Sequence, residues 1–182
     1  MSLSPVKRLV LETMWILDKP AKAKEIAEEI GLGFPSVMMH IIGLMRMGYV
    51  KAPQKGQYVI TEKGKRALGF PVIDREKAEE ILAPLPKEKF FSFYVDIGKP
   101  LGIYATSLQD FCDKVLKVDA DSVEFHVNRG DFETWFNCLG DLELARKILL
   151  LKERKASKEE LRKVIYDTVK DRCAELLKIK GT

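Results

Sequence analysis

The fold of the first third of the chain is decided by the stretch Ile30-Gly-Leu-Gly-Phe-Pro-Ser-Val-Met-Met-His-Ile-Ile-Gly-Leu-Met-Arg-Met-Gly-Tyr-Val50. A helical pattern ends at Gly31, the residue type that most easily takes the left-handed conformation closing a helix. A second helical pattern begins near Pro35 and stops at Gly48, after which a strand begins. The sequence therefore predicts helix, glycine turn, helix and strand, in that order.

Two helices are predicted before the glycine turn. Ser4-Pro5 starts the first, with Ser as the N-cap and Pro at the first helical position, where its missing N–H costs nothing. Lys19-Pro20 ends this helix, because the residue before a proline disfavours the helical conformation. The helix after the turn is predicted to bury one face, made of Val37, Ile41, Leu44 and Met47.

A β-hairpin and a short helix are predicted to follow. Residues 49–51 and 57–60 are rich in strand-forming side chains, and residues 53–56, Pro-Gln-Lys-Gly, are typical of a turn. Thr61 is placed as the N-cap of a helix that runs to Leu68.

Residues 4–68 resemble a winged helix-turn-helix domain of the type found in bacterial and archaeal transcription regulators. The resemblance is carried by residues 23–27 (Ala-Lys-Glu-Ile-Ala), by residues 58–64, and by the spacing of Val37, His40, Ile41, Leu44 and Gly48-Tyr49-Val50. It implies that the third helix enters the DNA major groove and that the hairpin, the wing, lies against the phosphate backbone. Some winged helices bind proteins instead, so the resemblance leaves two classes of function open.

The distribution of charge favours a nucleic-acid partner. Residues 1–70 hold 11 Lys and Arg against 6 Asp and Glu, a formal charge of +5, whereas residues 71–182 hold 20 against 21, a charge of −1. A positive surplus confined to one domain is expected if that domain approaches double-stranded DNA. The basic residues predicted to meet phosphate are Lys22, Lys24, Lys51, Lys55, Lys63, Lys65 and Arg66.

The outward face of the third helix has few groups that could read bases. Base reading normally uses hydrogen-bonding side chains such as Arg, Asn and Gln. The residues predicted to lie nearest the bases are Ser36, Met39 and His40.

Three explanations are open for the apolar side chains Phe34, Met38 and Ile42 on the same face. A second domain or partner subunit covers them, DNA meets them through thymine methyl groups, or another protein docks on them. Gly43 destabilises the middle of a helix by about 1 kcal/mol, so another backbone is expected to approach there.

The chain is predicted to divide into residues 1–70, a linker with a short helix at 71–88, and a second domain at 89–182. The fold class is mainly α with small β-hairpins, an α+β arrangement. The second domain opens with a hairpin at residues 90–95 and 101–105. Its helices are predicted to begin near Thr106, Ser122, Asp131, Asp141 and Ser157. For residues 122–128 the alternation of Val123, Phe125 and Val127 leaves a strand open as the alternative.

Residues 88–150 resemble an uncharacterised domain family of archaeal and bacterial proteins. The resemblance is carried by residues 105–108 (Ala-Thr-Ser-Leu), 125–126 (Phe-His), 129–133 (Arg-Gly-Asp-Phe-Glu), 135, 139–141 and 144–145. It implies a shared fold and no known activity.

Candidate chemistry in the second domain is limited. His126, Arg129, Asp131 and Glu133 form the best catalytic cluster, but Asp131 is equally explained as an N-cap to which His126 is tied. No nucleophile motif, phosphate-binding glycine loop or metal-ligand spacing is present, so we expect no enzyme, metal or cofactor. A small-molecule effector site is an alternative to core packing for the aromatic residues Phe91, Phe93, Tyr104 and Trp135.

The remaining features point to a cytoplasmic protein. Cys112, Cys138 and Cys173 are odd in number and widely spaced, which fits a reducing compartment. No apolar run approaches the ~20 residues of a membrane span.

The helix after Ser157 either pairs with its mate in a homodimer or packs on its own domain. The resulting hypothesis is a DNA-binding transcriptional regulator; the alternative is a protein-interaction module whose third helix is the docking surface.

Overall fold

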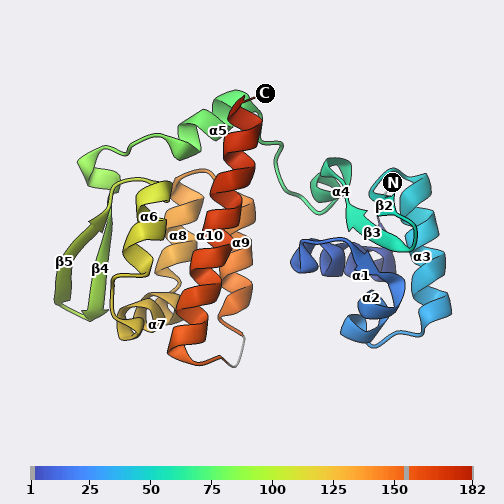
Figure 1. Ribbon diagram of the computed structural model, residues 1–182, viewed down its shortest axis with the longest axis horizontal. Coiled ribbons are helices and arrows are strands. Elements are labelled where there is room, and N and C mark those ends of the chain that lie inside the picture. Colours follow the sequence, from blue (N-terminus) through green and yellow to red (C-terminus); the bar gives the residue numbers. More distant parts are fainter. Residues whose placement is uncertain (1–2, 154–155, 182) are drawn as a thin grey trace. The chain divides into compact units, whose positions relative to one another are not determined.

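The computed structural model describes residues 3–153 and 156–181, and the chain divides into two compact units, Met1–Val72 and Ile73–Thr182 (Figure 1). Both units consist mainly of helices. The first also contains a three-stranded antiparallel sheet, and the second contains a two-stranded one. The predicted fold class, mainly α with small β-hairpins, is confirmed.

The first unit has its sheet interleaved with its helices. Its elements are α1 (Pro5–Leu17), β1 (Ala21–Lys22), α2 (Ala23–Ile30), α3 (Phe34–Arg46), β2 (Val50–Gln54), β3 (Gln57–Ile60) and α4 (Glu62–Ala67). In the sheet, β3 lies between β1 and β2.

The helix ends of the first unit follow from local sequence. The Ser4 hydroxyl accepts a hydrogen bond from the Lys7 N–H at 3.4 Å, and the Thr61 hydroxyl accepts one from the Gly64 N–H at 3.1 Å. Gly31 closes α2 with φ of 67°. The predicted N-caps and the glycine C-cap are therefore confirmed.

Strand β1 is a feature that the sequence does not predict. Ala21 pairs with Tyr58 and Lys22 with Gln57, so β1 forms one edge of the sheet. Two residues are too few to show the alternation that marks a strand, and their partners lie far along the chain. Tertiary pairing alone creates this strand.

Helix α3 is held in the first unit by a narrow apolar stripe. Val37, Ile41 and Leu44 are each 0% exposed, in a helix that packs on α1 and α2. Met47, the fourth residue predicted on this face, is half-buried just beyond the helix. The predicted inward face is confirmed for the three residues within the helix.

The second unit begins with a helix and a hairpin and continues as a helical layer. Its elements are α5 (Arg75–Leu82), the short 3-10 helix η1 (Lys87–Lys89), β4 (Phe91–Asp96), β5 (Lys99–Ala105), α6 (Leu108–Val115), α7 (Ala120–Arg129), α8 (Asp131–Cys138), α9 (Leu142–Leu151) and α10 (Lys158–Gly181). The five predicted helix starts lie within two residues of those observed.

Helix α5 belongs to the second unit and not to a linker. Its Ala78 and Ile81 are buried in the core of that unit, and the helix packs on α10. The boundary between the units therefore lies between Val72 and Ile73, at the start of the segment interpreted as a linker at 71–88. Helix α5 is short, so the pattern of its apolar residues does not reveal from the sequence alone what the helix packs against.

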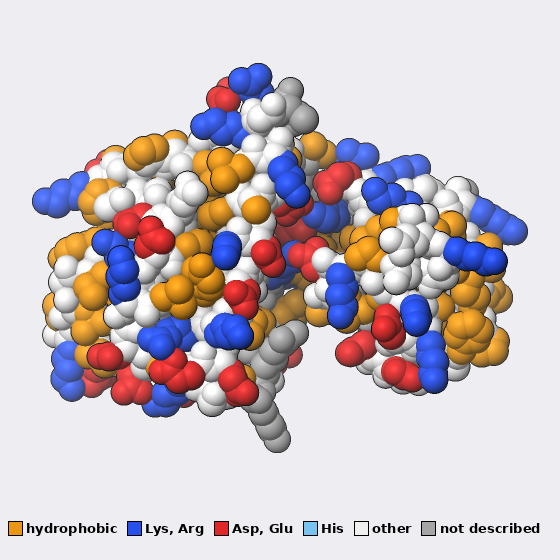
Figure 2. Space-filling model, in the orientation of Figure 1, with side chains coloured by type: hydrophobic (Ala, Val, Ile, Leu, Met, Phe, Trp, Pro, Cys, Tyr) orange, Lys and Arg blue, Asp and Glu red, His pale blue; other side chains and the backbone are white. Residues whose placement is uncertain are grey.

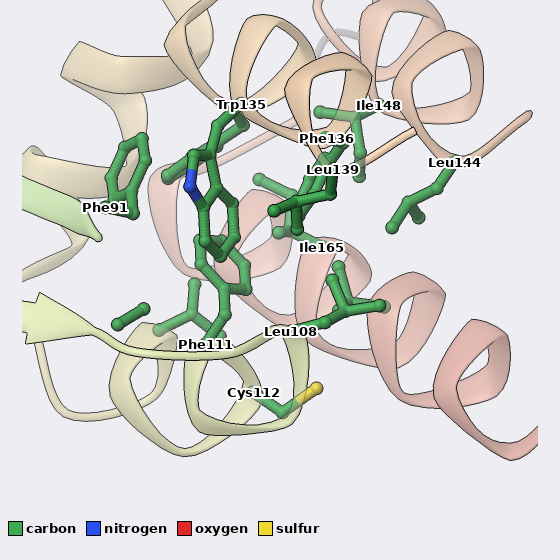
Figure 3. Packing of buried hydrophobic residues seen from close by; sticks show 14 of the residues in the cluster. Phe91, Leu108, Phe111, Cys112, Trp135, Phe136, Leu139, Leu144, Ile148 and Ile165 are labelled. Carbon is green, nitrogen blue, oxygen red and sulfur yellow. The ribbon is translucent and has the colours of Figure 1, made fainter. Parts of the chain in front are cut away.

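Aromatic rings fill the centre of the second unit (Figure 3). The Trp135 ring lies 5.4 Å from the Phe91 ring and 5.5 Å from the Phe111 ring, and its indole N–H donates to the Lys89 carbonyl at 2.9 Å. Phe93 is also in this core, whereas Tyr104 is 49% exposed. The four aromatic residues considered as an effector site therefore form no single group, and three of them are packed in the core.

Helix α10 uses its apolar stripe within the second unit. Ile165, Val169, Cys173 and Leu176 are buried in the core, and α10 packs on α5, α6, α7 and α9. Of the two arrangements open for this helix, packing on its own domain accounts for the stripe.

A buried ion cluster joins α10 to the start of α9. Asp141 caps α9 by accepting from the Leu144 N–H at 3.0 Å, as predicted. The Arg172 guanidinium donates to both Asp141 oxygens, at 2.8 and 3.0 Å, and to Glu143 at 3.1 Å. Burial by itself would lower the pKa of Arg172, but hydrogen bonding and the charges of these carboxylates outweigh it and raise the pKa. The guanidinium stays charged and crosslinks two helices.

We expect Arg172→Met to destabilise the second unit by about 3–5 kcal/mol, because it removes the cation that two buried carboxylates share. Arg75→Met is the matched control: Arg75 pairs with Glu79 at the surface, so its loss should cost less than about 1 kcal/mol. The chain has two tryptophans, Trp15 in the first unit and Trp135 in the second. Urea titration of fluorotryptophan-labelled protein, followed by fluorine NMR, therefore reports each unit separately. Equal losses in both variants would contradict a stabilising role for the cluster.

Candidate nucleic-acid interface

Helix α3 is placed by a tight turn after α2. The Leu32 N–H donates to the Ala27 carbonyl at 3.1 Å, which closes α2, and Gly33 is the N-cap of α3. Pro35 occupies the first turn of α3, and no acidic residue lies in that turn. The partial positive charge at the start of the helix is therefore not neutralised locally.

The outward face of α3 is apolar and exposed. Phe34 is 52% exposed, Met39 63% and Ile42 41%, and Met45 continues the same surface at 37%. Figure 2 shows hydrophobic side chains gathered along the edge of the first unit where α3 lies. We call Phe34, Met39, Ile42 and Met45 the apolar surface of α3. The first unit leaves this surface uncovered.

Three other residues predicted on this face are only half exposed. Met38 is half-buried because the Tyr58 hydroxyl of β3 lies against it, 3.7 Å from its sulfur. Met38 therefore contacts the sheet and contributes less to an outer surface than predicted. Ser36 and His40 are half-buried as well, so of the three residues expected nearest the bases only Met39 projects fully.

Gly43 is explained by a side chain and not by a neighbouring backbone. A Cβ at this position would lie 3.2 Å from Cε of Lys7, on α1. The aliphatic part of Lys7 thus occupies the space that glycine leaves, and its ammonium group lies beside α3. Lys7 is a basic residue of this region that sequence reasoning missed, because only the packing of α1 on α3 brings it there.

Four of the predicted phosphate contacts are exposed lysines. Lys24 lies 3.8 Å from Glu28 in a pair that is largely exposed and therefore weak. Lys22 is the N-cap of α2, where its backbone N–H donates to Glu25 at 2.8 Å. The side chains of Lys51 and Lys55, on the β2–β3 hairpin, have no hydrogen bond or ion pair with any residue that the structure describes. Their charges are thus available to a phosphate.

Two other predicted phosphate contacts are engaged within the unit. The Lys63 ammonium donates to the Met47 carbonyl at 2.8 Å and lies 5.4 Å from the centre of the Tyr49 ring. Lys65 is 9% exposed and lies 3.5 Å from Glu62. Lys63 therefore ties α4 to the end of α3, whereas the Lys65–Glu62 pair lies within α4 itself. Arg66, also in α4, is exposed.

The histidine of the second unit is held in one tautomer. The ring nitrogen Nε2 of His126 accepts from the Tyr94 N–H at 2.8 Å, so Nδ1 carries the proton and donates to Asp131 at 2.7 Å. Burial lowers the pKa of His126, and Asp131 opposes this only in part. Because both ring nitrogens are engaged, His126 joins α7 to β4 and α8.

Asp131 is not the N-cap of α8. That position belongs to Gly130, and the Asp131 carboxylate instead receives hydrogen bonds from His126 and from Arg129, the latter at 3.2 Å. The predicted N-cap role is wrong because the side chain turns toward the end of α7. The predicted tie between His126 and Asp131 is present, and Arg129 joins it through the same carboxylate oxygen.

Comparison with known proteins gave a partial match. Over 47 residues the chain is 51% identical to the uncharacterized protein MJ0558 of the archaeon Methanocaldococcus jannaschii. The matched part is 26% of this chain and 18% of that protein, so most of the relative lies outside the match. No protein-family model and no solved structure matches the chain.

No helix among the residues that the structure describes is both long and apolar enough to span a membrane. Within the same residues, no group of three or more His, Cys, Asp or Glu side chains is placed to hold a metal ion.

The stability of the second unit should fall as the pH drops from 7 to 5. The pKa of His126 is lowered by folding, so below its unfolded value of about 6.5 the unfolded chain binds a proton that the folded chain refuses. The slope that His126 contributes is at most about 1.4 kcal/mol per pH unit. The variant His126→Gln should lack this dependence on pH. The free energy of unfolding of the second unit is measured at each pH by urea titration, with the fluorine signal of labelled Trp135 as the probe. His40→Gln, which lies in the first unit, is the control. An unchanged slope in His126→Gln would contradict this assignment.

Proposed function

We propose that residues 4–68 form a winged helix-turn-helix domain that binds double-stranded DNA, and that the protein acts as a transcriptional regulator. The single observation that carries the proposal is the pair of unpartnered lysines, Lys51 and Lys55, on the β2–β3 hairpin that follows an exposed helix α3. In this proposal α3 is the recognition helix and the hairpin is the wing.

The order of elements supports this assignment. Helices α1, α2 and α3 are followed by two antiparallel strands, and a short strand after α1 completes the sheet. Helix α3 is fixed by one buried stripe while its opposite face is exposed, which a helix needs in order to enter a groove. Its first turn lacks acidic side chains that would repel phosphate.

The charge of the unit supports a phosphate-dominated mode of binding. Lys22, Lys24, Lys51 and Lys55 are exposed, and the formal charge of residues 1–70 is +5. Each lysine that neutralises a phosphate releases condensed counterions, and this release makes the affinity salt-dependent. Four such contacts would lower the affinity by about two orders of magnitude between 50 and 200 mM salt.

The apolar surface of α3 suits contact with thymine methyl groups. Met39 and Ile42 offer no hydrogen bonds to bases, whereas the methyl group of thymine is an apolar feature of the major groove. Ser36 and His40, half-buried beside them, are the polar groups that this proposal places nearest the base edges.

A second function is supported by the same surface. Four exposed apolar side chains on one helix are unusual in a helix that faces only water, and methionines adapt to varied partners. In that alternative the apolar surface of α3 is a docking site for another protein.

DNA binding is tested by fluorescence anisotropy with a labelled random duplex. Wild-type protein should bind at 50 mM salt and lose about 100-fold in affinity at 200 mM. The variant Lys51→Glu with Lys55→Glu should abolish binding, because both phosphate contacts become repulsive. Lys87→Glu with Lys117→Glu is the matched control: it changes the net charge equally but at exposed positions of the second unit.

Two outcomes would count against the proposal. Absence of wild-type binding at 50 mM salt would contradict the regulator hypothesis and favour the docking alternative. Equal losses in the two charge-reversal variants would show that net charge, and not the hairpin, governs the interaction.

A further inference from the structure

A hollow of about 310 Å³ opens on the second unit, between β4, the β4–β5 turn and the end of α7. Its walls include Phe91, Tyr94, Ile97, Phe125, Arg129 and Asp131. This volume lies at the lower end of the range for small-molecule sites, about 300–1,000 Å³. The lining combines aromatic rings, the aliphatic side chain of Ile97, the Arg129 guanidinium and the Asp131 carboxylate.

The back of the hollow is held by hydrogen bonds. The Tyr94 N–H donates to His126 at 2.8 Å, and the Tyr94 carbonyl accepts from the Ser122 hydroxyl at 2.7 Å. Both bonds join β4 to α7. The hollow is therefore formed before any ligand arrives.

Arg129 is positioned by its neighbours but keeps one edge free. Its Nε donates to Asp131 at 3.2 Å, and its guanidinium carbon lies 5.2 Å from the centre of the Phe125 ring. Neither Nη atom has a hydrogen-bond partner among residues 3–153 and 156–181. The side chain is 50% exposed. Two parallel N–H donors thus remain at the hollow, the arrangement that binds a carboxylate with two hydrogen bonds.

The Asp131 carboxylate does not require Arg129. The same oxygen of Asp131 already receives the His126 proton at 2.7 Å, a shorter bond than the one from Arg129. The Nη edge of Arg129 therefore takes no part in holding Asp131.

The rest of the hollow is apolar and partly exposed. Ile97, at the β4–β5 turn, is 76% exposed, a large value for a branched apolar side chain. Phe125 and Tyr94 are half-buried, so part of each side chain remains accessible. A flat apolar group placed here would cover Ile97 and lie against a ring.

We propose that this hollow binds a small carboxylate attached to a flat apolar group, that is, an aryl carboxylate. The carboxylate pairs with the Nη edge of Arg129, and the ring packs on Phe125 and Ile97. A cationic ligand is disfavoured because Arg129 repels it, and Oδ2 of Asp131 already receives hydrogen bonds from His126 and Arg129. All residues that line the hollow belong to the second unit, so this proposal does not rest on DNA binding by the first unit.

The test uses benzoate and phenylacetate as probes, with the full chain and saturation-transfer difference NMR. Both should bind with a dissociation constant on the order of 1 mM, as expected for ligands of this size. Benzamide, which lacks the charge, and acetate, which lacks the ring, should each bind at least about tenfold more weakly. In isotope-labelled protein the Ile97 methyl signal should shift during titration with benzoate.

Variants locate the site. Arg129→Gln should weaken benzoate binding at least about tenfold, and Arg129→Lys should be intermediate, because lysine keeps the charge but not the planar pair of donors. Arg75→Gln, a surface arginine of the same unit, should bind as wild type. Unchanged signals of Ile148 and Ile165, both in the core, verify that each variant is folded.

As a second probe of position, Ile97→Asp places a negative charge at an exposed turn and should abolish binding of both carboxylates. The proposal is overturned if neither aryl carboxylate binds at millimolar concentration, if Arg129→Gln binds benzoate as tightly as wild type, or if Ile97→Asp has no effect.

Discussion

The burial of Val37, Ile41 and Leu44 is the interaction on which the functional arrangement of the first unit depends. These three side chains, fully removed from water, hold α3 against α1 and α2 along one narrow stripe. Because the stripe occupies only one side of the helix, the opposite side is free to carry Phe34, Met39, Ile42 and Met45 in exposed positions. Anchoring and exposure are thus two consequences of one helical periodicity.

In the second unit, buried polar groups join elements that are distant in the sequence. Asp141 both caps α9 and binds the Arg172 guanidinium, while His126 joins β4 to α7 and α8 through its two ring nitrogens. Such groups are stable in an apolar core only when their hydrogen bonds are satisfied. The hydrogen bonds of His126 to Tyr94 and Asp131 also hold the walls of the proposed ligand site beside Arg129. The same bonds therefore stabilise the fold and shape the site.

Sequence reasoning was reliable where the signal is local and failed where it is not. The caps at Ser4, Thr61 and Asp141 depend on residues three positions away, and all were predicted. Asp131 carries the same local signal, yet its carboxylate turns to His126 and Arg129. A side chain with two competing sets of donors cannot be assigned from spacing alone. Strand β1 and the core position of α5 likewise depend on partners distant in the chain.

The sequence by itself determined the order of the helices and of the two hairpins, the inward face of α3, the mainly helical class and the surplus of positive charge in residues 1–70. Only the tertiary structure decided which lysines are free. Lys63 and Lys65 are engaged within the first unit, whereas Lys51 and Lys55 are unpartnered among the described residues. The physical reason is that helical periodicity and capping act within a few residues, whereas the partners of a charged side chain are set by which distant elements pack beside it.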